Sequence, residues 1–535
     1  MLAMHSIDDN DALKTIDTLK VEDPKTIELS EVFSVEEFLQ VVEVALGSLS
    51  IYLADDTLRG LALTEPQHIM HEARQLMTSD LGEPHSAARQ EKLKAILELY
   101  IKTGIQVHSP GYMGRQFSGV IPMAGIVDLV NSIINQPSSF YEAAQLPSVA
   151  ERIMANELNR FIGYPDDNFA LVTTSGASLA NLTALLTARN SRYPQFWAEG
   201  APVTKNQERP AIAVSGDSHY SVSRAAGIMG IGEAQLVKLP IDGKGCIDLS
   251  KVGATLDAAK ARGLDVFCLV ATSGTTSVCA FDPIEELAEV CQKRNIWLHV
   301  DAAHGGSLLL SEQRKHKLKG IEKADSFAWD AHKMLFMPAM CTLLFYKEGN
   351  KRRLAFNQEA SYVFEKEDDI YTEYDSAQGN FECTKRPLIM NLWVCWVMYG
   401  KALFEKKIDL LCELTDSAYH FLEQQPDFTA LHRPEANILC FRYCPSQVTD
   451  AELSDFQLRL RNDIKAAGKF FISKVNIDGI TALRVVFMNH ETTLVHFSML
   501  LDELRQTATQ WREDRNVAMR TQYNIKNGAN EAEQI

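Results

Sequence analysis

The chain has 535 residues, of which 46% are hydrophobic, and a formal net charge of −17 at pH 7. This length exceeds a single small core, so two or three structural units of an ordinary globular protein are expected. The negative charge argues against a general nucleic-acid or anionic-membrane binder, because such proteins need a basic surface. A small-molecule substrate remains compatible, since the field inside a pocket can have the opposite sign.

Ten cysteines are scattered between positions 246 and 444, and none forms a CxxC pair. Most lie in apolar stretches, which is typical of reduced core cysteines in a cytoplasmic protein rather than of a disulfide framework or zinc site. Residues 1–14 are acidic and lack a long apolar segment, so no signal peptide is expected. The apolar stretch 387–400 is too short to cross a bilayer, and no membrane partner is expected.

The N-terminal part has helical patterning but no recognisable chemistry. Apolar residues recur with a helical period from Ser34 to about Tyr52, and 93–105 is a second helix candidate. We predict that residues 1–107 form a helical arm that packs on a partner subunit. The Gly- and Pro-rich stretch 108–119 follows, and it is either a surface connection or a substrate loop carrying Arg115 and Gln116.

Strands and helices alternate in the middle of the chain. We predict strands at 169–173, 211–215, 266–272 and 296–300, and helices at 149–161, 179–189, 284–293 and 388–401. Polar residues follow each strand, which predicts an α/β fold with a mainly parallel sheet that binds ligands at the carboxyl ends of its strands.

The chain from residue 108 onward is divided into three predicted parts. Residues 108–400 are assigned to the large sheet domain. Residues 401–520 are assigned to a smaller α+β domain, because helices there alternate with strands at 437–443 and 481–487. The polar segment 521–535 is predicted to be a flexible tail.

A run of small residues, Ser175-Gly176-Ala177-Ser178, joins the first of these strands to a helix. Its backbone N–H groups could approach an anion, and the helix N-terminus adds partial positive charge. The stretch is neither a P-loop nor a GxGxxG fingerprint. It therefore predicts either a phosphate cradle or simply a helix that is capped by a serine.

The stretch 298–306 is more specific. Asp301 ends a buried strand, where a carboxylate needs a partner, and a pyridinium nitrogen would be one. Ala303 could lie flat beneath an aromatic ring. His299, Asp301 and His304 could imitate metal ligands, but side chains alternate along a strand, so His304 should not share the face of the other two. No metal site is predicted.

Lys333 stands between two mostly apolar runs, 325–331 and 334–345. Burial disfavours the charged form of a lysine, and a neutral amine is a nucleophile. We hypothesise that Lys333 forms a Schiff base with a carbonyl cofactor. By itself, such a lysine is more often a surface residue whose stem covers apolar groups, so the other motifs must decide.

In combination, the motifs resemble those of the pyridoxal-phosphate-dependent group II amino acid decarboxylases, which include glutamate, aromatic-amino-acid, cysteine-sulfinate and diaminobutyrate decarboxylases. The matching motifs, in the family's order and spacing, are 175–178 with Asn181, 217–221, 274–276 with 280–282, 299–303 and 332–333. The resemblance runs from about residue 100 to about residue 500. It implies a fold type I enzyme with a sheet of the seven-stranded type, covered by helices on both faces.

The resemblance implies how pyridoxal 5'-phosphate would be held. Lys333 would bind it covalently, and His219 and Ala303 would lie on opposite faces of its ring. Asp301 would bond the ring nitrogen and keep it protonated, because an adjacent negative charge favours the cation. The remaining cofactor positions match Ala177, Ser178 and His332 at the phosphate and Thr276 close to the cofactor and substrate.

The resemblance also implies substrate and proton-transfer residues. Arg484 matches an arginine that pairs with the substrate α-carboxylate, a planar and bidentate task that suits a guanidinium. Catalysis would use Lys333 and His219, together with a loop tyrosine that protonates Cα. Tyr371 is the first candidate for this tyrosine and Tyr374 the second.

Two departures from the family pattern are evident. Asp330-Ala331-His332-Lys333 stands where many members have Asn-Pro-His-Lys. Asp330 would be repelled by a phosphate, so it is expected to point away from it or to be bridged by water. Cys383-Thr384-Lys385 stands where others have an arginine after Cys-Gly. Neither change removes an essential group.

The implied reaction converts an L-amino acid to its amine and carbon dioxide. Arg115 could bind a side-chain carboxylate, which favours glutamate, aspartate or cysteine sulfinate. Diaminobutyrate, other aliphatic and aromatic amino acids remain alternatives. So do same-fold transamination, desulfuration and oxidative deamination, and a non-catalytic binding protein. The protein is expected to be a cytoplasmic homodimer whose active site lies at the subunit interface. It is expected to bind neither nucleic acid nor a metal ion.

Overall fold

The structure is a computed structural model that describes residues 28–79, 85–165, 168–200, 208–356, 374–375, 377, 379–477 and 479–511. The chain forms two compact units. One comprises the residues up to Tyr112 together with Lys465–Phe471, and the other comprises Met113–Ile464 and the residues from Ile472 onward.

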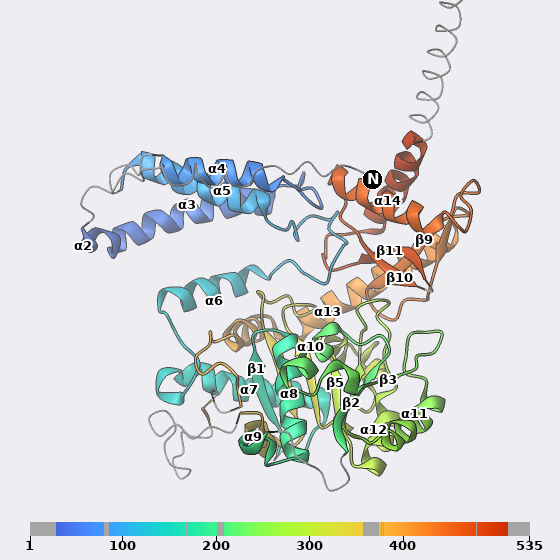
Figure 1. Ribbon diagram of the computed structural model, residues 1–535. Coiled ribbons are helices and arrows are strands. Elements are labelled where there is room, and N and C mark those ends of the chain that lie inside the picture. Colours follow the sequence, from blue (N-terminus) through green and yellow to red (C-terminus); the bar gives the residue numbers. More distant parts are fainter. Residues whose placement is uncertain are drawn as a thin grey trace, which may run out of the picture. The chain divides into compact units, whose positions relative to one another are not determined.

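The first unit is built from helices (Figure 1). They are α2 (Leu29–Val32), α3 (Val35–Ala54), α4 (Pro66–Thr78) and α5 (Ala87–Thr103). Ser34 and Ser86 cap α3 and α5 by accepting hydrogen bonds from Glu37 N and Arg89 N. The two predicted helices of this region are confirmed, whereas α4, which begins at a proline, was not predicted.

Helix α3 leaves its apolar side chains largely uncovered. Ser48 is its one buried residue, and Leu39, Leu46, Leu49 and Leu53 are 44–59% exposed. Among the described helices, α3 is the one that is long and apolar enough to cross a membrane by length and composition, and 6% of that window is buried. A contiguous apolar surface of this kind is typical of an interaction site.

The second unit is organised around a seven-stranded sheet. Its strands are β1 (Ala170–Thr174), β2 (Arg209–Ser215), β3 (Leu236–Leu239), β4 (Leu264–Thr272), β5 (Trp297–Asp301), β6 (Ser326–Asp330) and β7 (Thr342–Tyr346). Their order is β1-β7-β6-β5-β4-β2-β3, and only β7 runs antiparallel to its neighbours. The mainly parallel sheet of the predicted fold type I architecture is confirmed.

Both faces of this sheet are buried. Val172, Val270 and Leu344 face the core that includes α8, while their neighbours Leu171 and Phe345 point to the other face and are equally buried. Such strands read as nearly continuous apolar runs, because helices cover a parallel sheet on both sides.

Two helices of this unit precede β1, and helices and strands then alternate from β1 to β5 (Figure 1). They are α6 (Pro122–Ile133), α7 (Gln145–Ile162), α8 (Ala177–Arg192), α9 (Phe196–Glu199), α10 (Tyr220–Ile228), α11 (Leu249–Ala261) and α12 (Ile284–Arg294). Short 3-10 helices cover Tyr141–Ala143, Glu233–Gln235, Gly305–Leu310, Lys315–Leu318, Ile321–Lys323 and Gly349–Leu354.

A smaller antiparallel sheet completes the second unit. Helix α13 (Ile389–Glu423) is longer than predicted and is broken at Gly400, whose φ of 65° favours glycine. The sheet has the order β10-β11-β9-β8. Its strands are β8 (Phe428–Ala430), β9 (Ile438–Tyr443), β10 (Ser473–Ile477) and β11 (Ile480–Val486), and its helices are α14 (Leu453–Ala467) and residues 494–511.

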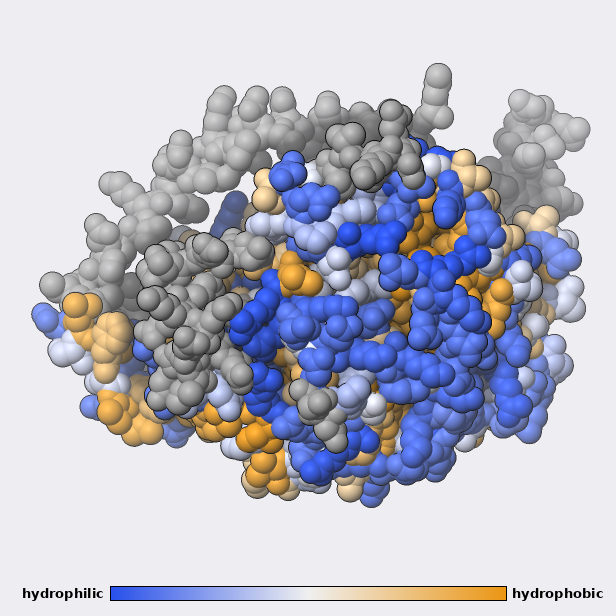
Figure 2. Space-filling view, turned by 90° about the horizontal axis from the view of Figure 1, so that it is seen from below, coloured by the Kyte–Doolittle hydropathy of each residue, from blue (hydrophilic) through white to orange (hydrophobic). Residues whose placement is uncertain are grey.

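The hydropathy of the surface and the burial of the cysteines agree with what the composition predicts. The face seen in Figure 2 is largely hydrophilic, with small groups of hydrophobic residues between. All ten cysteines are free, and seven of them are buried. The expectation that most of the cysteines lie in the core is therefore confirmed.

Candidate active site

The predicted site residues follow five strands that run in one direction. Ala177 and Ser178 follow β1, His219 follows β2, and Thr276 follows β4. Asp301 ends β5, and Lys333 lies three residues beyond the end of β6. Because the carboxyl ends of parallel strands share one edge of the sheet, these side chains gather at that edge.

The phosphate side is the N-terminus of α8. Its N-cap is Gly176, with φ 110° and no capping side chain, so the alternative of a serine-capped helix is wrong. Ala177 and Ser178 form the first turn, where backbone N–H groups lack intrahelical acceptors. A φ of this sign favours glycine, and a Cβ at Gly176 would also come within 3.1 Å of Met340 Sδ, so the methionine side chain would have to shift. This end of α8 fits a phosphate group.

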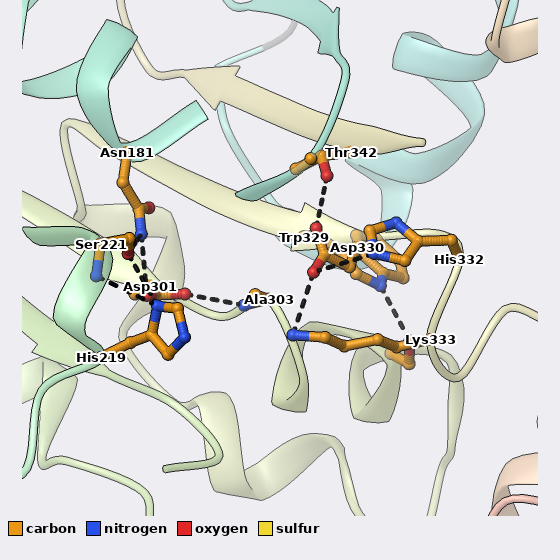
Figure 3. Close-up of polar contacts among 12 residues, drawn as sticks. Asn181, His219, Ser221, Asp301, Ala303, Trp329, Asp330, His332, Lys333 and Thr342 are labelled. Atoms are coloured by element: carbon orange, nitrogen blue, oxygen red, sulfur yellow. Dashed lines mark hydrogen bonds and ion pairs between the residues drawn. The ribbon is translucent and has the colours of Figure 1, made fainter. Parts of the chain in front are cut away.

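Asp301 is buried and is held by neutral donors (Figure 3). Asn181 Nδ2 donates to its Oδ2 at 2.9 Å, and Ala303 N donates to its Oδ1 at 3.2 Å. Asn181 also donates to Ser221 Oγ at 3.0 Å and lies 3.0 Å from His299 Nε2. Burial lowers the pKa of His299 to about 4, so this histidine is neutral near pH 7. Among the described residues, no cation lies within ion-pair distance of the Asp301 carboxylate.

His219 is the N-cap of α10. Its Nδ1 lies 2.9 Å from Ser221 Oγ and accepts a hydrogen bond from Ser221 N at 3.3 Å. Burial lowers the pKa of His219, and the negative charge of Asp301 opposes this effect. Ser221 therefore contacts both His219 and Asn181, which orients the imidazole beside the Asp301 cluster.

Lys333 is paired with Asp330. Its Nζ lies 3.0 Å from Asp330 Oδ2, and the other carboxylate oxygen accepts a hydrogen bond from Thr342. In Figure 3, the Lys333 side chain extends from its turn toward Ala303. Ser118 Oγ donates to the Lys333 backbone carbonyl at 2.9 Å. The lysine is thus partly buried, as predicted, but it has an anionic partner that burial alone did not suggest.

His332 lies beside this pair. Its Nε2 is 3.6 Å from Asp330 Oδ2, and its Nδ1 contacts the backbone of Cys341. His304 is also buried, with Nε2 at 2.7 Å from Asn437 Oδ1, and burial, followed by the positive charge of Lys333, lowers its pKa to about 3. Within the described residues, no group of three or more His, Cys, Asp or Glu side chains is arranged to hold a metal.

Thr276 is exposed on a tightly closed loop. Thr275 Oγ1 accepts a hydrogen bond from Ala280 N at 2.9 Å, and Gly305 N donates to Ser273 O at 3.0 Å. A Cβ at Gly305 would come within 2.5 Å of Ser273 O, so this contact requires glycine. The loop after β4 is therefore fixed against the segment that carries Asp301 and Ala303.

Arg484 lies on β11, buried, with most of its donors engaged. Nε donates to Ser277 O at 3.1 Å, and Nη1 donates to Ser473 Oγ at 3.0 Å and Gly114 O at 3.5 Å. Nη2 is buried and has no partner among the described residues. The donors that remain belong to one nitrogen, so the arrangement does not provide the bidentate fork expected from the sequence.

Arg115 and Gln116 lie on the segment that runs beside β11, since Val486 N donates to Met113 O at 2.8 Å. Arg115 is exposed, while Gln116 Nε2 is buried without a partner among the described residues. The charge of Arg115 contributes to lowering the pKa values of Arg461 and Arg484, after burial as the main cause. The Arg115 charge thus lies within electrostatic reach of both other guanidinium groups.

Of the two candidate tyrosines, one lies within the described residues. Tyr371 lies outside the described residues, so its assignment stays a prediction. Tyr374 has its ring centroid 5.6 Å from that of Tyr141 and 5.8 Å from Arg152 Cζ. The adjacent Asp375 is buried and accepts a hydrogen bond from Tyr141 N at 2.9 Å.

Sequence reasoning gave no role to several residues that build the site. Asn181 belonged to a recognised motif but had no assigned partner, and Asp330 had no assigned place. Ser277 was not singled out, although its hydroxyl donates to Asp217 beside His219 and its carbonyl accepts from Arg484. The available signal was polarity at otherwise apolar strand ends, which does not reveal partners.

Comparisons with known proteins agree with this geometry. A family model described as the pyridoxal-dependent decarboxylase conserved domain matches residues 73–444. Human cysteine sulfinic acid decarboxylase is 28% identical over 447 residues, covering 81% of this chain and 89% of that protein. The acidic amino acid decarboxylase GADL1 of Xenopus tropicalis is 27% identical, covering 78% and 80%. The crystal structure of mouse CSAD matches with a TM-score of 0.78 and 25% identity, covering 88% of this chain and 97% of that one.

Proposed function

The chain belongs to the family of pyridoxal-dependent decarboxylases and is an amino acid decarboxylase that uses pyridoxal 5'-phosphate, and we propose that its substrate is an acidic L-amino acid. Glutamate, aspartate and cysteine sulfinate are the members of this class that we consider. When bound, the cofactor accepts the electron pair that remains on the substrate Cα as carbon dioxide leaves.

The cofactor's ring nitrogen is assigned to Asp301. This carboxylate is buried among neutral donors, and a protonated pyridine nitrogen would supply the cation that it lacks. His219 and Ala303 would lie on the two ring faces, and Lys333 would hold the cofactor covalently. The first turn of α8, with Ala177 and Ser178, would bind the phosphate, together with His332.

The cationic group around Arg484 is the observation that carries the choice of an acidic substrate. Neither Arg115 nor Arg484 has an Asp or Glu partner among the described residues. A substrate with a second acidic group besides its α-carboxylate would offset two of these charges. We assign the α-carboxylate to Arg484 Nη2, and the side-chain acid to exposed Arg115 with Gln116 beside it. The names of the relatives, cysteine sulfinic acid decarboxylase and acidic amino acid decarboxylase, support the same class.

A product survey tests the proposal. Purified protein with cofactor is incubated with aspartate, glutamate, cysteine sulfinate, 2,4-diaminobutyrate and tryptophan, and the amines are quantified by mass spectrometry. We expect kcat/KM for one acidic substrate to exceed that for the last two by at least about 100-fold, roughly 2.7 kcal/mol. Preferred turnover of diaminobutyrate or tryptophan would contradict the assignment.

Arg115→Ala sharpens the same test. The variant should lower kcat/KM for the acidic substrate about 10- to 100-fold, because it removes a charge-assisted contact. Arg209→Ala is the matched control, since Arg209 is exposed at the opposite, amino end of β2. If kcat/KM were equal in both variants, Arg115 would not contact the side-chain acid.

A homodimer is the proposed working form. The apolar residues exposed on α3, and Ile126, Val130 and Ile133 on α6 at 48–58% exposure, would be covered by a second copy. Light scattering should give twice the chain mass of 59.8 kDa. Association with lipid vesicles by a monomer would instead make α3 a membrane contact.

The ten free thiols support a reducing compartment, which we propose is the cytoplasm.

Subunit mixing tests whether the active site lies at the interface. Lys333→Ala and Tyr371→Phe should each be inactive alone. If the loop of one subunit completes the site of the other, a mixture regains activity, because one site of each heterodimer has both residues. No recovery in a mixture that forms heterodimers would place both residues in the same chain's site.

A further inference from the structure

Asp330 is a buried acid that the cofactor and substrate assignments leave without a task. It ends β6, where its register partner is Thr342 of the antiparallel strand β7. Its backbone N donates to Ala303 O at 3.2 Å, which ties it to the segment beneath the proposed cofactor ring. Its side chain is 2% exposed, so the carboxylate cannot be solvated by bulk water.

The carboxylate oxygens of Asp330 have separate partners. One accepts the hydroxyl of Thr342, and the other lies 3.0 Å from Lys333 Nζ (Figure 3). A turn fixes this contact, because Lys333 N donates to Asp330 O at 3.4 Å. His332 Nε2 is 3.6 Å away, outside hydrogen-bond distance, and its Nδ1 is engaged with Cys341. Among the described residues, Asp330 is thus the base in contact with the reactive amine.

We infer that Asp330 is the proton acceptor that converts the Lys333 ammonium into the nucleophile that attacks the cofactor aldehyde. The inference rests on the assignment of Lys333 as the covalent residue. The Asp330–Lys333 ion pair would then take part in the capture of the cofactor as well as in the packing of the site. It also gives Asp330 a target other than the phosphate, which would repel it.

The step balances without any further reagent. Asp330 Oδ2 takes one proton from the ammonium, and the nitrogen lone pair forms a bond to the aldehyde carbon. The aldehyde oxygen leaves as water with that proton, returned by Asp330, and a second proton from the nitrogen. The nitrogen keeps its last proton in a carbon–nitrogen double bond, and nothing is oxidised or reduced.

Charge explains why a buried acid suits this position. The nitrogen carries one positive charge as an ammonium and one as the protonated double bond. The Asp330 carboxylate therefore has a cation beside it before and after the step, and it is never left as a buried, uncompensated charge. A neutral residue at position 330 would lack both the base and this compensation.

Asp330→Asn tests the inference through cofactor capture rather than turnover. The apoenzyme is mixed with a series of pyridoxal 5'-phosphate concentrations in a stopped-flow instrument, and the absorbance of the carbon–nitrogen double bond is followed. Borohydride trapping and peptide mass spectrometry confirm that Lys333 is modified. We expect the saturating bond-forming rate to fall roughly 100-fold, a typical contribution of a positioned base. Asp325→Asn, the same change at the other end of β6, should leave this rate within threefold.

Two further measurements separate the chemical role from cofactor binding. Lys333→Met and the Lys333→Met, Asp330→Asn double variant report non-covalent binding of the cofactor, and their Kd values should agree within threefold. Pyridoxal, which lacks the phosphate, should show the same fold loss of bond-forming rate as the phosphorylated cofactor. A loss confined to the phosphorylated form, or one explained entirely by Kd, would overturn the inference.

A cavity variant covers the case in which Asp330→Asn disturbs the fold. Asp330→Ala leaves space for a small carboxylate, so added formate should restore the bond-forming rate in proportion to its concentration, while equal concentrations of chloride should not. Capture by either variant at the wild-type rate, or no response to formate in a folded Asp330→Ala enzyme, would show that Asp330 does not act as the base.

Discussion

Two buried aspartates end neighbouring strands of the central sheet, and they differ in the charge of their partners. Asp301, at the end of β5, accepts hydrogen bonds from the side-chain amide of Asn181 and the backbone of Ala303, which are neutral. Asp330, at the end of β6, is paired with the ammonium of Lys333. The two strands are hydrogen-bonded to each other, with Asp301 in register with Ala328, so Asp330 lies two residues further along the same edge of the sheet.

The difference separates two tasks. A buried carboxylate without a cation is a site that is ready to receive one, and at Asp301 the proposed cation is the ring nitrogen of the cofactor. A buried carboxylate that already has its cation can hold it or exchange a proton with it, as inferred for Asp330. Both carboxylates are buried at a strand end, so the charge of the partner distinguishes their roles.

Removal of the Lys333 amine should have the largest effect. Lys333→Met is expected to lower decarboxylation by about four orders of magnitude or more, because the covalent step is lost. It also leaves Asp330 as an unpaired buried charge, so the apoenzyme should lose about 3 kcal/mol of stability in urea unfolding. Adding Asp330→Asn should restore most of that loss.

A surface pair with the same residue types and spacing provides the control for this stability effect. Lys251 and Asp248 also form an Asp–Lys pair three residues apart, but the lysine side chain is 58% exposed. Lys251→Met should cost less than about 1 kcal/mol. Equal losses for the two lysine variants would mean that burial of Asp330 does not make its pairing important.

Asp301→Asn should separate the two aspartates. We expect kcat to fall about 100- to 1,000-fold, because the variant lacks the fixed negative charge that favours a protonated ring nitrogen. The bond-forming rate with Lys333 should stay within threefold of wild type, which is the reverse of the pattern for Asp330→Asn. If both variants slowed capture equally, the distinction between the two carboxylates would be lost.

Arg484 is a buried cation that can be compared with the buried carboxylate of Asp301. Like Asp301, it is buried and has neutral partners, with Nη2 free. Arg484→Lys should lower kcat/KM about 10- to 150-fold, the equivalent of 1.5–3 kcal/mol for a hydrogen bond to a charged group. Arg442→Lys is the control, because Arg442 lies on the adjacent strand β9 and also donates to backbone carbonyls. A similar loss in both variants would indicate damage to the small sheet.

Much of the fold and the site could be predicted, because the signals were local. Apolar runs of strand length, each followed by small or polar residues, located β1, β2, β4 and β5 and the residues at their carboxyl ends. Helices α4 and α6 were not predicted, although each begins at a proline, a residue that suits the first turn of a helix.

Partners that depend on tertiary folding could not be predicted. Arg484 Nη1 contacts Gly114, which is 370 positions away in the chain, and Ser118 contacts the Lys333 backbone across 215 positions. The Asp330–Lys333 pair is close in sequence, yet its geometry depends on the turn between β6 and β7 and on the burial of Asp330. Residue types were visible in the sequence, while the charge balance around each of them was not.

The smallest predicted effect concerns the neutral neighbour of Asp301. Burial holds the pKa of His299 at about 4, below the ordinary value of 6.5, so the folded chain keeps this histidine neutral. Above pH 6.5 the histidine is neutral in both the folded and the unfolded chain, and its neutral form costs no stability. As the pH falls from 6.5 toward 4, only the unfolded chain takes up the proton, so stability is lost. At pH 5, His299 should reduce the apoenzyme's unfolding free energy by about 2 kcal/mol relative to pH 8. His299→Gln should remove about one proton from the pH dependence of urea unfolding between pH 5 and 6.5. An unchanged dependence would mean that His299 is protonated beside Asp301, and Asp301 would then resemble Asp330 in having its cation already.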